Sequence, residues 1–115
     1  MAFNDIEKAR FERPVREYIK RRRPPPPIRP QLDIGFRFKN QSVELFEIRP
    51  MWREPDKKIE HSIAKATFVK SRNIWRVYWE RADLKWHSYE PHAEVNTIED
   101  FLSVVEADQY GCFYG

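Results

Sequence analysis

Cysteine and glycine are scarce in this 115-residue chain, which contains one cysteine and three glycines. Because Cys112 is the single thiol, no disulfide can form within the chain, and we expect a cytoplasmic protein. No stretch approaches the roughly 18 consecutive apolar residues that a membrane-spanning helix needs, and no secretory signal is recognisable at the start. We therefore expect no membrane association. The scarcity of glycine also leaves no Gly-rich phosphate-binding loop.

Positive charge is missing from the last quarter of the chain. Residues 86–115 contain six acids and no lysine or arginine, whereas residues 1–30 contain nine lysines and arginines against four acids. The two ends therefore carry opposite charge, although the whole chain has a net charge of +3. A chain of this length is expected to form one domain. The gradient predicts an attraction between its two ends, or between the ends of two copies.

The N-terminal residues predict a basic helix that stops at a run of prolines. Asn4 and Glu7 form a capping-box pattern, and apolar residues then recur at helical spacing. Pro14 interrupts this pattern, so the helix is either kinked there or restarts one residue earlier. We interpret residues 1–23 as a helical basic arm and residues 24–31 as a Pro-rich linker that favours polyproline II and acts as a rigid spacer.

Alternating apolar and polar residues predict an antiparallel sheet over residues 32–90. The expected strands cover residues 32–39, 42–49, 63–70, 74–81 and 84–89. Their connections are too short for parallel crossovers, so we expect a meander of about five strands. Leu45 and Phe46 are adjacent and both bulky, which breaks the alternation and predicts a bulge.

A second helix is predicted near the C-terminus. Thr97 is a capping residue before an amphipathic stretch over residues 97–107. The tail that follows, residues 108–115, contains three aromatic side chains that we expect to pack on the domain. The order of helix, sheet and helix predicts one α+β domain over residues 1–115, with the C-terminal helix packed on one sheet face.

The chain also resembles a known family along nearly its whole length. The resemblance is carried by the segments Arg22–Pro25, Phe46–Trp52, Asp83–Tyr89 and Tyr110–Gly115. They are similar to a family of small bacterial proteins catalogued as a domain of unknown function (number 3024). This resemblance implies a bacterial, cytoplasmic, stand-alone domain. It implies no activity and supplies no catalytic residues.

Two groups of residues suggest a binding surface for nucleic acid. The candidates are Arg21, Arg22, Arg23 and Arg29 of the basic arm and linker, and Trp75, Arg76, Trp79 and Trp86 of the sheet. Arginine binds phosphate oxygens in a bidentate manner, and exposed aromatic rings on a sheet can stack on bases. A solvated helix face and cross-strand packing explain the same residues without any ligand. Our leading hypothesis is a non-enzymatic binding domain whose partner is nucleic acid or another protein.

An enzyme is the first alternative. The first predicted hairpin carries two acids and a cation, Asp33, Glu47 and Arg49. Some metal-dependent nucleases place two acidic metal ligands and a cation on such a hairpin. Arginine is a poor base, because its pKa exceeds about 12. His87, between aromatic residues, is the best candidate for acid–base chemistry. The histidines and Cys112 show no zinc spacing, so we expect neither a metal nor a cofactor.

Self-association is the second alternative. The charge gradient would let the basic arm of one subunit dock on the acidic C-terminal region of another, which would form a homodimer.

Overall fold

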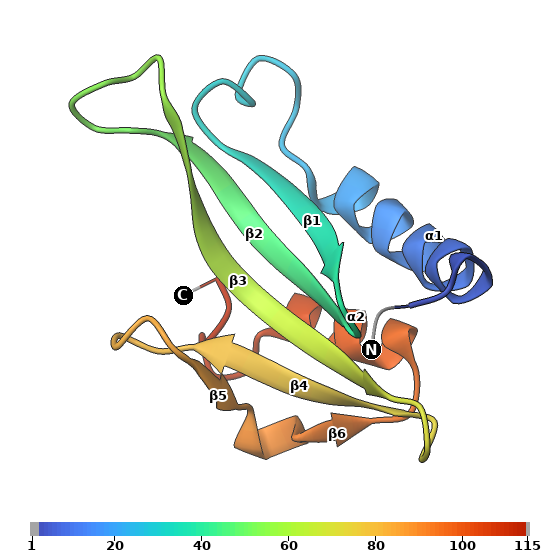
Figure 1. Cartoon of the computed structure of the whole chain (residues 1–115). Helices are drawn as coiled ribbons and strands as arrows, with labels where there is room; N and C mark the ends of the chain where they lie inside the picture. Colours follow the sequence, from blue (N-terminus) through green and yellow to red (C-terminus); the bar gives the residue numbers. More distant parts are fainter. Residues whose placement is uncertain (1–2, 115) are drawn as a thin grey trace.

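The computed structural model describes residues 3–114, in which two helices accompany a six-stranded sheet (Figure 1). The elements are α1 (Asp5–Arg22), β1 (Asp33–Lys39), β2 (Ser42–Pro50), β3 (Lys58–Val69), β4 (Ile74–Glu80), β5 (Trp86–Ser88), the 3-10 turn η1 (Glu90–His92), β6 (Glu94–Val95) and α2 (Ile98–Ala107). The predicted α+β fold is confirmed. Residues 1–2 of the expected arm and residue 115 of the expected tail lie outside the described residues.

The sheet is the predicted antiparallel meander, with strand order β1-β2-β3-β4-β5. The short strand β6 was not predicted; it pairs with β4 beyond the end of β5. Strand β3 begins at Lys58, five residues earlier than expected. Residues 58–62 pair with the end of β2 but are mostly polar and exposed, so their sequence lacks the alternation that marks a half-buried strand.

The predicted bulge occurs where β2 pairs with β3. Leu45 lies opposite Ala64, and the next residue, Phe46, lies opposite Ser62. The extra residue is therefore Ile63 on β3, and not a residue of β2. This step allows two consecutive residues, Ile63 and Ala64, both to be buried.

Helix α1 runs unbroken through Pro14 and does not restart there. The predicted capping box at Asn4 and Glu7 is confirmed. A proline inside a helix costs about 3 kcal/mol. Burial of Phe11, Val15 and Tyr18 on one face of α1 offsets this cost, because each large apolar side chain contributes about 1.5–3 kcal/mol.

The Pro-rich linker forms compact turns rather than an extended polyproline rod. Turn conformations cover residues 26–31. The amide of Ile28 donates to the carbonyl of Pro25 at 2.9 Å, and the amide of Leu32 donates to the carbonyl of Ile28 at 3.0 Å. Proline pre-sets the φ angle that such turns need, so the prolines reverse the chain here.

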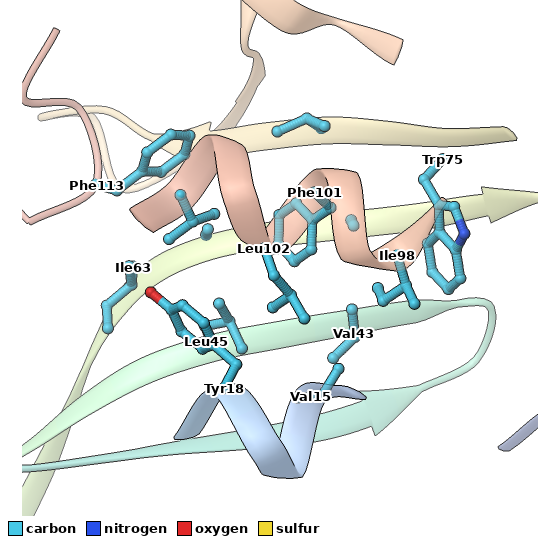
Figure 2. Packing of buried hydrophobic residues seen from close by; sticks show 14 of the residues in the cluster. Val15, Tyr18, Val43, Leu45, Ile63, Trp75, Ile98, Phe101, Leu102 and Phe113 are labelled. Atoms are coloured by element: carbon cyan, nitrogen blue, oxygen red, sulfur yellow. The ribbon is translucent and has the colours of Figure 1, made fainter. Parts of the chain in front are cut away.

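One hydrophobic core lies between the sheet and both helices (Figure 2). Tyr18 of α1 and Phe101 of α2 point towards the same sheet face. Trp75 is 1% exposed and packs edge-on against Phe11, with ring centroids 4.9 Å apart. The C-terminal tail joins this core through Phe113, whose ring lies 4.7 Å from that of Tyr89. The buried residues of both helices belong to this single cluster, so the opposite sheet face has no helix against it.

Candidate anion-binding site

A basic hollow of about 440 Å³ lies where α1 ends, between the helix, the proline turns and β1. Its lining consists of four cations, Arg16, Lys20, Arg23 and Arg29, and two apolar residues, Ile19 and Phe36. We name this site the basic hollow. Among the candidates from the sequence, it contains Arg23 and Arg29. The sequence pattern did not single out Phe36, because only the folded chain brings it beside these arginines.

Local structure explains why the cations converge. Arg16, Lys20 and Arg23 are three or four residues apart, so they follow one flank of α1. The proline turns then bring Arg29 back towards the helix end, where its Nε donates to the carbonyl oxygen of Pro24 at 2.9 Å. Strand β1 supplies Phe36, and the Arg16 guanidinium lies 5.5 Å from the centre of that ring.

Two carboxylates neutralise part of the charge in the basic hollow. Glu12 forms an ion pair with Arg16, and Asp33 accepts two hydrogen bonds from Arg23. The hydrogen-bonded Arg23 holds the pKa of Asp33 below its usual range, against a smaller opposing effect of burial. Within residues 3–114, Lys20 and Arg29 form no ion pair with a carboxylate, although the charge of Arg29 also helps to lower the pKa of Asp33. The basic hollow therefore keeps an excess of positive charge.

Arg21 and Arg22 lie away from the basic hollow, towards α2. The guanidinium of Arg22 lies 4.2 Å from the centre of the Tyr114 ring, and its Nε is 3.9 Å from a carboxylate oxygen of Glu106. A hydrogen bond to Tyr114 is the main cause that raises the pKa of Arg22. The attraction between the two ends of the chain, expected from the charge gradient, is thus present inside one molecule.

The candidate tryptophans are divided between the two faces of the sheet. Trp75 is a core residue, and Trp79 lies half-buried on the same face as Trp75. Trp86 is opposite Glu80 and lies on the other face, where the Lys65 ammonium is 5.2 Å from its ring and 5.0 Å from that of Tyr78. The tryptophans therefore do not form one stacking surface.

Arg76 points to the face without helices. Its Nε lies 3.8 Å from a carboxylate oxygen of Glu94, which also accepts hydrogen bonds from Arg72. This candidate is therefore part of an ion-pair group on the sheet and lies apart from the basic hollow.

The structure does not bring Asp33 and Glu47 together. Asp33 is opposite Ile48 across the hairpin, whereas Glu47 is opposite Ile34. Because successive side chains of a strand point to opposite faces, the two carboxylates lie on different faces. Arg49 donates to Glu47 itself, at 3.2 Å. Within residues 3–114 no three potential ligands cluster to hold a metal ion.

His87 lies in a second hollow of about 240 Å³, together with Trp79 and Cys112. Its Nε2 is 2.8 Å from a carboxylate oxygen of Asp83, and this contact is the main cause that lowers the pKa of Asp83. Burial raises the pKa of the Cys112 thiol. The thiol is therefore protonated at neutral pH, which makes it a weak nucleophile.

None of the helices in the described part of the chain is long and apolar enough to span a membrane. A family model with the description "Domain of unknown function (DUF3024)" matches residues 3–115. No curated protein and no solved structure matches the chain. The matched family has no stated activity, so the functional conclusion depends on the geometry of the site.

Proposed function

This chain belongs to the DUF3024 family of domains of unknown function, and we propose that it is a non-enzymatic module that binds single-stranded nucleic acid. The observation that carries the proposal is the basic hollow, where four cations surround an apolar floor. Nucleic acids offer both features of a matching ligand, because an anionic phosphate is joined to an apolar base.

Lys20 and Arg29 are the phosphate ligands in this proposal. Neither forms an ion pair with a carboxylate within residues 3–114. The Nε of Arg29 is occupied by the Pro24 carbonyl, which orients the guanidinium and leaves its two terminal amino groups for an anion. Arg23 is held by Asp33 through Nε and Nη2, so its Nη1 is the group that faces a ligand.

The apolar floor favours a single strand over a duplex. Phe36 and Ile19 offer a surface for a base or a sugar, and the basic hollow has the size of a small-ligand pocket. A base inside a duplex is stacked between its neighbours and cannot enter a hollow on a protein surface. A base in a single strand can turn outward and stack on an aromatic ring.

Fluorescence anisotropy with labelled single-stranded oligonucleotides, in a salt series, tests the proposal. Two phosphate contacts predict that log K falls against log salt with a slope of about −1.4, since each contact contributes about −0.7. The double variant Lys20→Ala/Arg29→Ala should bind about 100-fold more weakly at low salt, if each charged hydrogen bond contributes about 1.4 kcal/mol or slightly more.

The matched control removes the same charges elsewhere. Arg81→Ala/Lys85→Ala alters the turn between β4 and β5, at the sheet edge opposite β1. This variant should keep its affinity and its salt slope. Absence of binding by the unaltered protein at low salt would refute the proposal. An equal loss of affinity in both double variants would also refute it, because the attraction would then be general and not centred on the basic hollow.

A further inference from the structure

A groove of about 650 Å³ separates α1 from α2 on the other flank of α1. Its floor contains Pro14, Tyr18 and Leu102, and its two rims are charged. The α1 rim consists of Arg13, Glu17 and Arg21, and the α2 rim consists of Glu99, Ser103 and Glu106. One side of the groove therefore carries two cations with one acid between them, and the other side carries two acids and a hydroxyl group.

The charges on the two rims have matching spacing. Arg13 and Arg21 are eight residues apart, which corresponds to about 12 Å along a helix. Glu99 and Glu106 are seven residues apart, or about 10.5 Å. Between them lie Glu17 on one rim and Ser103 on the other, whose hydroxyl can donate to a carboxylate. The rims would thus complement each other position by position if two such grooves met.

Most of these charges are unsatisfied within the chain. Arg13, Arg21 and Glu99 form no ion pair within residues 3–114. Glu106 has a single loose partner, the Arg22 Nε at 3.9 Å. The groove therefore offers rim charges that a partner can pair, while Tyr18 and Leu102 at its floor are already buried.

We infer that a second copy of this chain covers the groove and forms a symmetric dimer. A two-fold axis places the same surface on both subunits, so the surface must complement itself. This groove does so, because the cations Arg13 and Arg21 of one copy meet the acids Glu99 and Glu106 of the other, and the reverse pairs form at the same time. Half-buried Pro14 then lies between the two copies, above Tyr18 and Leu102, which are already buried within each chain.

The dimer is independent of nucleic-acid binding. Arg16, Lys20 and Arg23 of the basic hollow follow a different flank of α1 from Arg13 and Arg21. Closing the groove with a second copy leaves both basic hollows open. The dimer and the binding activity can therefore fail separately in experiments.

Charge reversal tests the dimer, with light scattering after size exclusion as the measurement. The unaltered protein should have twice the mass of one chain. Arg13→Glu/Arg21→Glu should give a monomer, and so should Glu99→Arg/Glu106→Arg, because each places like charges opposite one another. An equimolar mixture of the two variants should recover the dimer, since their rims again have opposite charge.

Arg53→Glu/Lys57→Glu, in the loop between β2 and β3, makes the same charge change outside the groove and should stay dimeric. Circular dichroism checks that each variant is folded. If Arg13→Glu/Arg21→Glu does not fold, the charge-neutralising variant Arg13→Gln/Arg21→Gln takes its place. A monomeric unaltered protein at low and high salt would overturn the inference. Reversal variants that remain dimeric, or a mixture that remains monomeric, would overturn it as well.

Discussion

Arg23 donates two hydrogen bonds to the carboxylate of Asp33, from Nε at 2.8 Å and from Nη2 at 2.7 Å. The pair joins the end of α1 to the start of β1 and closes the loop made by the proline turns. The Asp33 carboxylate also accepts from the amide of Ile34 at 2.9 Å. The residue that the sequence suggested as a metal ligand thus anchors one wall of the basic hollow.

Because of this pair, we expect the pKa of Asp33 to lie below the ordinary value of about 3.9. A carboxyl group whose pKa is lower in the folded state stabilises the fold at pH values above the pKa that the same group has in the unfolded chain. The contribution is lost as the pH falls through the lower, folded value. NMR titration of the carboxyl carbon should show this depressed midpoint. Arg23→Ala should raise it towards the ordinary value, and Arg13→Ala should leave it unchanged.

Phe11 should be among the most sensitive positions for stability. It is 7% exposed and contacts the rings of Phe68 and Trp75, with centroids 5.1 Å and 4.9 Å away. Phe11→Ala removes a ring from the core, so the free energy of unfolding should fall by about 3–5 kcal/mol in urea titration. Ile6→Ala on the same helix is the control. Ile6 is 80% exposed, so its loss should change stability by about 0.5 kcal/mol or less.

The hydroxyl groups of Tyr18 and Tyr114 should be energetically coupled. Their oxygens lie 2.5 Å apart, 96 positions apart in the chain. The pKa of Tyr18 is raised mainly by burial and also by this hydrogen bond. Tyr18 therefore stays protonated in alkaline solution. Tyr18→Phe, Tyr114→Phe and the double variant form a thermodynamic cycle. Its coupling energy should be about 1 kcal/mol, and additive effects would show that the bond contributes nothing.

Cys112 should react slowly with thiol reagents at neutral pH. Burial raises its pKa, with a further contribution from the carboxylate of Asp108, so little thiolate is present. The rate of disulfide exchange with Ellman's reagent should rise steeply only in alkaline solution. A fast reaction at pH 7 would indicate an activated thiol and would favour an enzyme that uses the hollow beside His87. Urea-unfolded protein provides the reference rate for a free thiol.

Local patterns in the sequence predicted most of the fold. These patterns are the helix caps at Asn4 and Thr97 and the spacing of apolar residues, and each depends only on neighbouring residues. Both helices and the meander were predicted from them. Local patterns failed where packing overrides them. Pro14 stays inside a continuous helix because the apolar face around it is buried, and residues 58–62 extend β3 because β2 supplies their hydrogen bonds.

The candidate site was only partly predictable. Arg23 and Arg29 were expected because arginines are conspicuous in a basic, Pro-rich run. Phe36 was expected only as a strand residue, because its position beside Arg16 depends on the packing of α1 against β1. Trp75 and Trp86 look equivalent in the sequence, yet one is in the core and the other is on the opposite face, since the helices cover only one side.

The sequence by itself therefore determined the order of the elements, the opposite charges of the two ends and the single thiol, because each is a property of composition or of near neighbours. Tertiary structure decided which charges act together. It folds the proline run into turns that bring Arg29 to the basic hollow, places Arg22 beside Glu106, and leaves Arg13 and Arg21 on a groove of their own. The physical reason is that these contacts join residues far apart in the chain, and burial of the shared core sets where each segment lies.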